Sequence, residues 1–173
     1  MRADALRWHL LGIVETLCLP DCWIGAGFVR NAVWNHLHQG AVAAPEGDVD
    51  VIWYDPDCTN AAEDRRLEDH LKTLEPAIAW SVKNQARMHR RNGDSPYTSA
   101  TDAMRYWPET ATAVAARRIG LDGCEIAAPY ALDDLFNLVL RPTFRFRAEK
   151  RAAYEDRIRS KGWIGAWPLL TMA

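Results

Sequence analysis

The sequence predicts an α/β protein of the α+β type, in which helices flank a small mixed β-sheet. Segments with apolar residues at helical spacing alternate along the chain with short runs rich in β-branched and aromatic residues. The chain contains no internal repeat, low-complexity tract or flexible linker. A chain of this length forms one core comfortably, so we expect a single domain over residues 1–173.

Helices and strands alternate in the first half of the expected fold. Apolar residues at helical spacing begin near the N-terminus, and Pro20 ends that first helix. Short apolar or β-branched runs predict the strands. In chain order we expect a helix over 3–18, a strand over 22–24, a helix over 28–38, a strand over 48–54, a helix over 60–74 and a strand over 78–89.

The second half is expected to add a hairpin and further helices. The Asn92-Gly93 pair predicts a loop over 90–98. Residues 110–119 either pair with 124–127 as a hairpin or, because they are rich in alanine, form a helix. We also expect a short helix over 101–106, an amphipathic helix over 132–140 and a charged helix over 147–161.

Composition and cysteine use limit the location and the partners of the protein. The formal net charge of −2 creates no global positive field, so a nucleic acid or an anionic membrane would need a local patch. The N-terminus lacks the apolar core of a signal peptide, and no apolar run is long enough to cross a bilayer. The four cysteines include no CxxC pair, so we expect free, buried thiols, no membrane partner and a cytoplasmic location.

A glycine-rich turn separates the second predicted helix from the strand before it. The turn consists of Gly25, Ala26 and Gly27, and Arg30 follows one helical turn later. Glycines let the backbone approach a bound group closely, and a helix N-terminus offers unpaired N–H donors to phosphate. The segment therefore predicts a phosphate-binding turn. A tight turn that only permits packing is the alternative, since the spacing matches neither a Walker loop nor GxGxxG.

Two carboxylates stand at the start of the next predicted strand. Asp48 and Asp50 are separated by one residue, so their side chains project from the same face. Carboxylates this close raise one another's pKa unless a cation lies between them. Mg²⁺, or Mn²⁺ in its place, prefers such oxygen ligands and completes its shell with water or phosphate. The apolar run 51–53 predicts a buried strand with its acidic end at the sheet rim; two solvated acids are the alternative.

Together the turn and the acids resemble the polymerase β-like nucleotidyltransferase superfamily, in which a strand, a small-residue turn and a helix precede a strand with Asp-x-Asp. Residues 27–31 resemble the Gly-x-Val-Arg-Asp start of tRNA-nucleotidyltransferase and poly(A) polymerase head domains. Residues 83–89, 108–112 and 128–136 resemble a bacterial family of compact nucleotidyltransferase-like proteins whose reaction is not established. This second resemblance covers most of the chain.

The resemblance implies a nucleotidyltransferase-like fold and a Mg²⁺-dependent transfer. A nucleoside triphosphate would bind with its phosphates against the Gly25–Gly27 turn, and Asp48 and Asp50 would hold one or two Mg²⁺ ions. The ions would lower the pKa of an acceptor hydroxyl and neutralise the charge that grows on the α-phosphate and on the departing pyrophosphate.

The chain departs from the superfamily pattern at several positions. Ala26 replaces one of the paired small residues of the turn, and Asn31 replaces an acid. Many superfamily members carry a third carboxylate on the next strand, but residues 81–87 contain no acid. Asp55 has the wrong parity to share a face with the acid pair. The sequence therefore predicts a site with two acids.

Three further side chains complete the candidate site. Asn84 either faces the carboxylates and holds a water or a ribose hydroxyl, or bonds the backbone at the strand end. Arg87 either binds a triphosphate or forms a surface salt bridge, and His89 either transfers protons or bonds a neighbour. Arg30 either reaches phosphate or pairs with Asp50.

A basic set lies in the last third of the chain and suits the phosphates of RNA or DNA. A solvated helix face is the alternative, because three acids in the same stretch balance it. The basic residues are Arg141, Arg145, Arg147, Lys150 and Arg151, and the acids are Glu149, Glu155 and Asp156.

The residues leave two functions open. The first is a Mg²⁺-dependent nucleotidyltransferase that moves a nucleoside monophosphate from an NTP to a hydroxyl of a small molecule, a protein or an RNA end. The second is a catalytically degenerate module that senses nucleotide or binds a partner on the same fold. A structural protein with a surface rich in tryptophan is a third and weaker hypothesis, supported by the eight tryptophans.

Overall fold

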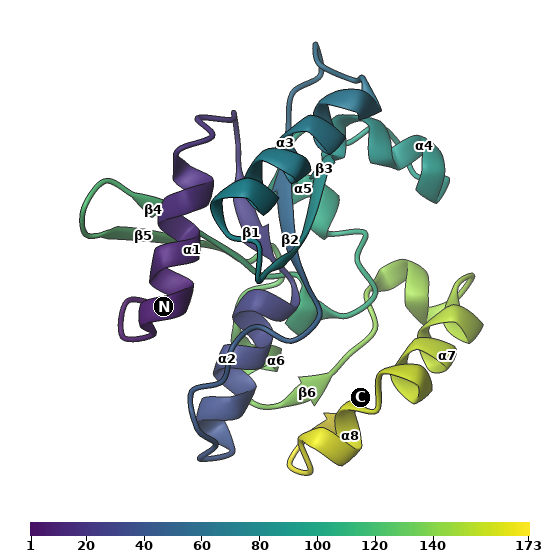
Figure 1. Ribbon diagram of the computed structural model, residues 1–173. Helices are drawn as coiled ribbons and strands as arrows, with labels where there is room; N and C mark the ends of the chain where they lie inside the picture. Colours follow the sequence, from purple (N-terminus) through teal and green to yellow (C-terminus); the bar gives the residue numbers. More distant parts are fainter.

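A five-stranded mixed sheet forms the centre of the computed structural model, which describes residues 1–173 (Figure 1). The strands lie in the order β3-β2-β1-β4-β5. Only β2 and β3 run parallel, and every other neighbouring pair in this sheet is antiparallel. The strands are β1 (Trp23–Gly25), β2 (Asp48–Trp53), β3 (Ala79–Asn84), β4 (Ala115–Ile119) and β5 (Gly123–Ala127). This architecture confirms the predicted mixed sheet flanked by helices.

Eight α-helices surround the sheet, and a second sheet of two short parallel strands lies near the C-terminus. No helix is long and apolar enough to span a bilayer. The helices are α1 (Ala5–Glu15), α2 (Gly27–Leu37), α3 (Ala61–Leu74), α4 (Met88–Asn92), α5 (Ala100–Met104), α6 (Asp133–Phe136), α7 (Arg151–Lys161) and α8 (Trp163–Ala166). The short strands are β6 (Val139–Leu140) and β7 (Thr171–Met172).

Three of the predicted elements differ from the observed ones. The strand expected over 78–89 ends at Asn84, whose side chain accepts the N–H of Ala86 and caps a 3-10 turn. The helix expected over 132–140 is only α6, because Leu138 adopts a left-handed φ of 59° and leads into β6. The helix expected from residue 147 begins at Arg151, after a separate 3-10 turn.

The two faces of the sheet differ in what covers them. Val49, Val51 and Trp53 of β2 belong to the larger core cluster, together with buried residues of α1, α2 and α3. Alternation places Asp48, Asp50 and Ile52 on the opposite face. There Ile52 packs in a smaller cluster that includes residues of α5, while the acids remain at the open end of the strand.

The C-terminal segment returns to the sheet through a cluster of tryptophans. Trp163 and Trp167 pack edge to face against Trp34 of α2, with ring centroids 5.7 and 5.2 Å away. Trp167 also donates its indole N–H to Asn35 Oδ1 at 2.7 Å. These contacts hold α8, and with it the end of α7, against α2 (Figure 1). Most of the tryptophans are therefore core residues: six of the eight are at most 6% exposed.

Replacement of Trp163 by alanine is expected to lower the free energy of unfolding by about 3 kcal/mol, because the buried indole leaves a cavity against Trp34. Urea denaturation followed by circular dichroism measures this change. Ile164→Ala is the matched control on the same helix, since Ile164 is 42% exposed. Equal effects of the two substitutions would contradict the packing role of Trp163.

Candidate functional site

The acid pair lies on the open face of β2, directly beside β3. Asp48 is exposed and Asp50 is partly buried, and Asp50 lies opposite Ser81 in the parallel pairing. Burial and the nearby Asp48 carboxylate raise the pKa of Asp50 to about 6. Arg157, Lys161 and a hydrogen bond from Ser81 act in the opposite direction. The raised pKa of Asp50 shows that Arg157 and Lys161 do not fully neutralise the charge of the two carboxylates.

The donor set suits a hard divalent cation. Two neighbouring carboxylates, one of them resisting ionisation, gain from a cation that lies between them. Mg²⁺ in nucleotide sites uses one or two carboxylates, and water and phosphate supply the remaining ligands. No group of three or more His, Cys, Asp or Glu side chains is arranged to hold a metal. The acid pair therefore fits a metal that shares its ligands with a bound phosphate.

The turn after β1 brings backbone close to this pair. Ala26 has φ 54° and ψ −124°, a conformation that alanine adopts less readily than glycine, and its side chain gives α2 no cap. The first N–H groups of α2 therefore have no side-chain acceptor at Ala26. A Cβ on Gly25 would lie 2.8 Å from the Trp107 ring, so glycine is required where this ring packs on the turn.

Arg30 is a buried cation behind the turn. Its guanidinium donates to Thr112 Oγ1 at 2.8 Å and to Asn31 Oδ1 at 2.9 Å. It lies 4.9 Å from the Trp34 ring centre and 4.2 Å from that of Trp163. Burial lowers the pKa of Arg30 to about 10, so the side chain stays charged at neutral pH. Arg30 makes no ion pair with Asp50, and its hydrogen bonds hold it in the protein interior.

Arg157 and Glu109 join the site from the second half of the chain. Arg157 Nε donates to Glu109 Oε1 at 2.8 Å, and its guanidinium lies 5.2 Å from the centre of the Trp163 ring. Glu109 is fully buried, and its second carboxylate oxygen has no hydrogen-bond partner. Neither residue was predicted as part of the site. Two signals were available in the sequence: Glu109 lies within residues 108–112, which resemble the bacterial family, and the spacing of Arg157 and Lys161 places two cations on one face of α7.

A cavity of about 230 Å³ opens beside Asp50 and connects these groups. Asp50, Ala26 of the turn and Arg157 line one part of it, and apolar side chains such as Met88 and Trp107 line another. The cavity therefore offers both charged and apolar walls. Its lining consists of Ala26, Asp50, Val51, Ile52, Lys83, Gln85, Met88, Asn92, Trp107, Pro108, Thr112 and Arg157.

Asn84 is not part of this constellation. It lies opposite Trp53 in the β2–β3 register, which puts its side chain on the core face, away from the acids. Its amide donates to the carbonyls of Asp55 and Cys58 at 2.8 and 2.6 Å and accepts the N–H of Ala86 at 2.9 Å. Asn84 therefore holds the strand end in place, the second of the two roles that the sequence left open.

Arg87 and His89 also lie outside the cavity lining. They follow the end of β3, so strand parity does not place them. Arg87 forms an ion pair with Asp64 of α3, which is only 2% exposed. His89 packs its ring 6.0 Å from that of Tyr97. Arg87 therefore makes the salt bridge that the sequence left open as one of its two roles, although with a buried partner, and phosphate binding by Arg87 stays a prediction.

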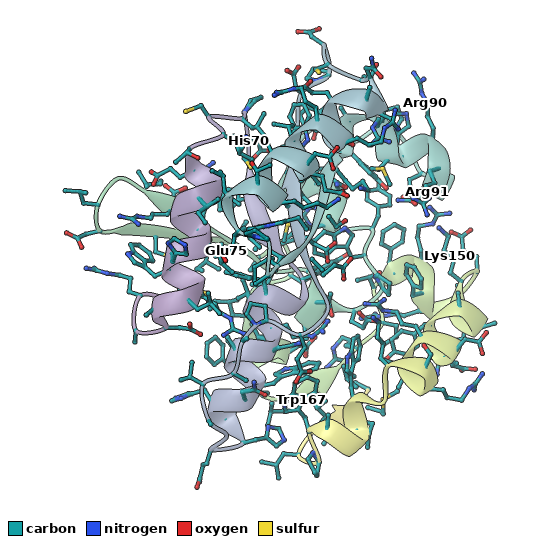
Figure 2. All side chains as sticks on the ribbon, viewed as in Figure 1. His70, Glu75, Arg90, Arg91, Lys150 and Trp167 are labelled. Carbon is teal, nitrogen blue, oxygen red and sulfur yellow. The ribbon has the colours of Figure 1, made fainter.

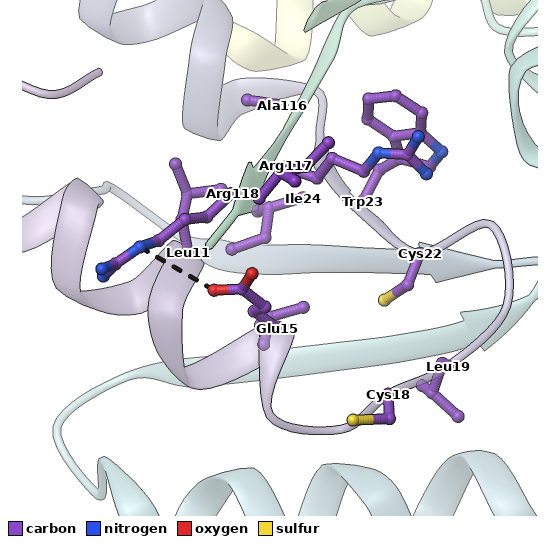
Figure 3. Close-up of a pocket in the computed structure, with 12 residues that line it drawn as sticks. Leu11, Glu15, Cys18, Leu19, Cys22, Trp23, Ile24, Ala116, Arg117 and Arg118 are labelled. Carbon is purple, nitrogen blue, oxygen red and sulfur yellow. Dashed lines mark ion pairs between the residues drawn. The ribbon is translucent and has the colours of Figure 1, made fainter. Parts of the chain in front are cut away.

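A second cavity of about 220 Å³ lies between α1, β1 and β4 (Figure 3). Its lining is mostly apolar, and its charged groups include the ion pair of Arg118 and Glu15 at 3.8 Å. Burial raises the pKa of Cys22 to about 12, so this thiol stays protonated and is a poor nucleophile. This cavity therefore carries no evident reaction chemistry.

Comparison with known proteins agrees with this geometry. A family model described as a nucleotidyltransferase matches residues 12–172. The chain belongs to this nucleotidyltransferase family. A solved structure described as "The NMR structure of the protein reveals a CCA-adding enzyme head domain" is similar to this one, with a TM-score of 0.82 and 37% sequence identity. The match covers 96% of this chain and 88% of that one. No curated protein matches the chain.

Membership of the nucleotidyltransferase family indicates what kind of substrate the site takes. The family implies a nucleotide substrate, and the resemblance to a polymerase β-like fold that the sequence suggested is confirmed. Within this fold, Asp50 of the acid pair, Ala26 of the turn before α2 and Arg157 line one cavity. The acceptor and the metal do not follow from family membership.

Asp50→Asn is expected to change how the stability of the metal-free protein depends on pH. The raised pKa means that native Asp50 keeps a proton between about pH 4 and 6 that the unfolded chain has lost. Unfolding stability therefore falls as pH rises through this interval, by about 2 kcal/mol, and stays low above it. The variant lacks this fall and is more stable than the wild type at pH 7.5.

Thermal melts in EDTA at pH 4.5 and pH 7.5 measure the difference. Asp122→Asn, a change of an exposed acid in the β4–β5 turn, is the control and should leave the pH dependence unchanged. A wild-type protein that gains stability between these pH values relative to Asp50→Asn would contradict the electrostatic description of the pair.

Proposed function

We propose that the protein is a Mg²⁺-dependent nucleotidyltransferase that transfers a nucleoside monophosphate from an NTP to a hydroxyl acceptor. The observation that carries this proposal is the acid pair on β2. Asp48 and Asp50 share a face, and Asp50, whose pKa is raised, lines the cavity together with Ala26 of the turn before α2. Mn²⁺ suits the same ligands. The four free cysteines agree with a reducing, cytoplasmic location.

The walls of the cavity suggest how a triphosphate would lie. The N–H groups at the start of α2 would donate to phosphate oxygens, since Ala26 offers them no side-chain cap. Arg157 lines the same cavity, and its guanidinium can form a bidentate hydrogen bond with a phosphate. Met88 and Trp107 form apolar surface against which a base or ribose would pack.

The protein's own groups would set up an in-line transfer between these walls. Asp48 and Asp50 would hold Mg²⁺, which when bound neutralises the charge that grows on the α-phosphate and on the departing pyrophosphate. Arg30, which donates to Thr112 and lies over the rings of Trp34 and Trp163, adds a positive charge behind the turn. Glu109 accepts Arg157 Nε and so fixes the direction of that guanidinium toward the cavity.

A non-catalytic nucleotide-binding module is the second candidate. The observation in its favour is that no third carboxylate joins Asp48 and Asp50 to complete a larger metal-binding group. Such a module would bind an NTP with Mg²⁺ without turnover.

Transfer of label from an α-phosphate-labelled NTP distinguishes these functions. We expect transfer that requires Mg²⁺ or Mn²⁺ and falls by about 100-fold or more in Asp48→Asn and Asp50→Asn, since the metal supplies several kcal/mol of transition-state stabilisation. Asp122→Asn is the charge-matched control. Transfer that persists in both active-site variants, with the fold intact, would sink the assignment.

Arg157 is expected to bind the triphosphate. Replacement of both members of its ion pair, Arg157→Ala with Glu109→Gln, should raise the KM for NTP about tenfold, because a charge-assisted hydrogen bond is lost while no buried carboxylate is left unpaired. Steady-state kinetics measure this effect. Arg159→Ala, on the same helix and paired with Asp156 at the surface, is the control. Equal KM values for the double variant and the wild type would remove Arg157 from the site.

A further inference from the structure

A row of four neighbouring aromatic side chains ends at the surface. The rings of His89, Tyr97, Tyr106 and Phe144 follow one another with centroid separations of 6.0, 5.0 and 5.8 Å. Tyr97 is buried, whereas Phe144 at the end of the row is 58% exposed. The row therefore presents a supported aromatic ring to solvent, from the 3-10 turn that precedes α7.

Basic side chains surround this exposed ring. Arg90 and Arg91 are exposed on α4, and neither has a carboxylate partner. Arg105 and Arg147 are also exposed and also lack one. Both contribute positive charge at Tyr130, which places them near one another. Four arginines with no paired acid therefore lie on the segments that carry the aromatic row.

Contacts between α4 and the start of α7 join these segments into one surface. Lys150 Nζ donates to the carbonyl of Asn92 at 2.9 Å, and Arg145 donates to that of Gly93 at 3.3 Å. Figure 2 shows Arg90, Arg91 and Lys150 along the same edge of the molecule. Burial lowers the pKa of Lys150, Arg145 acts in the same direction and Glu149 acts in the opposite one. Asp94 pairs with Arg145 and lies 3.9 Å from Lys150, so the unpaired positive charge of this surface comes from the four arginines.

The same surface reaches the cavity of the acid pair. Asn92, whose carbonyl accepts Lys150, lines the cavity. Trp107 also lines it and follows Tyr106 of the aromatic row in the chain. A chain molecule that lay along the surface could therefore place its end in the cavity.

We propose that this surface, formed by Phe144, Tyr106, Arg90, Arg91 and Lys150, binds single-stranded nucleic acid. Unpaired arginines suit a phosphate backbone, and an exposed aromatic ring stacks with a base only where that base is unpaired. A duplex would use the charges but not the ring, because its bases are already stacked on one another. The net charge of −2 makes this a local site rather than a property of the whole chain.

The same surface also indicates the class of the acceptor, and this inference rests on the proposed function. The terminal hydroxyl of the bound strand would be the acceptor in the cavity. Its oxygen bonds to the α-phosphorus of the NTP, the bond from that phosphorus to the pyrophosphate breaks, and the hydroxyl proton passes to water. The products are a strand longer by one nucleotide and pyrophosphate.

Fluorescence anisotropy with a labelled 12-nucleotide RNA tests the surface without any transfer. The assay contains EDTA and no NTP, and the same RNA annealed to its complement is the second ligand. We expect the single strand to bind at least tenfold more tightly than the duplex, with an affinity that falls as salt rises. Absence of binding at low salt, or equal binding of the duplex, would overturn the proposal.

Variants separate the two parts of the surface. Arg90→Ala with Arg91→Ala should weaken binding and reduce the salt slope by about two, because two phosphate contacts are lost. Phe144→Ala should weaken binding about tenfold and leave the salt slope unchanged. Arg2→Ala and Leu121→Ala, two exposed side chains outside this surface, are the matched controls. If Phe144→Ala binds like the wild type, the ring takes no part and the proposal is wrong.

Extension of the bound RNA then tests the acceptor role. We expect the same RNA to gain one nucleotide from an NTP, and RNA with a 3′-deoxy end to gain none. Transfer only to other acceptors would overturn the acceptor assignment while the proposed function stands. RNA that binds, with no transfer to any acceptor, would remove the proposed function while the binding surface stands.

Discussion

The alternation of side chains along β2 is the constraint on which the rest of the site depends. Val49, Val51 and Trp53 are buried in the main core, so the strand has one register in which its apolar residues are satisfied. That register forces Asp48 and Asp50 onto the opposite face. The core thus stabilises an arrangement in which two carboxylates lie close together and one of them resists ionisation.

The C-terminal third of the chain converts this acidic rim into a lined cavity. The tryptophans of α8 and the segment after it dock against Trp34 of α2, and this docking places Arg157 of α7 beside Asp50. Trp163 serves both purposes, because it packs on Trp34 and stacks with Arg30. The packing of Trp163 and Trp167 on Trp34 therefore also determines where Arg157 of α7 places its positive charge.

Local patterns in the sequence were sufficient to predict the parts of the fold that depend on local spacing. Strand parity placed Asp48 and Asp50 on one face, and the small-residue turn predicted the approach of backbone to that face. Asn84 was harder, because its face depends on the register of β3 with β2, which no local pattern contains. Arg87 required knowledge of Asp64, which comes from a different helix.

Local sequence patterns could not predict that Arg157 and Glu109 join the site, because this also depends on contacts between distant parts of the chain. They lie far from the acids in sequence, and only the tertiary packing brings them to the cavity. The hairpin of β4 and β5 is a local contact, and it was one of the two alternatives that the sequence left open, because the alanines of its first strand also suit a helix. Element types and faces follow from short-range periodicity, whereas the composition of the site depends on contacts across the chain.

Electron paramagnetic resonance of Mn²⁺ in the presence of an NTP observes the metal at the acid pair whether or not transfer occurs. We expect the wild-type protein to bind Mn²⁺ with the nucleotide, and the folded variant carrying Asp48→Asn and Asp50→Asn not to bind it. Equal Mn²⁺ binding by the two proteins would show that the acid pair is not the metal site.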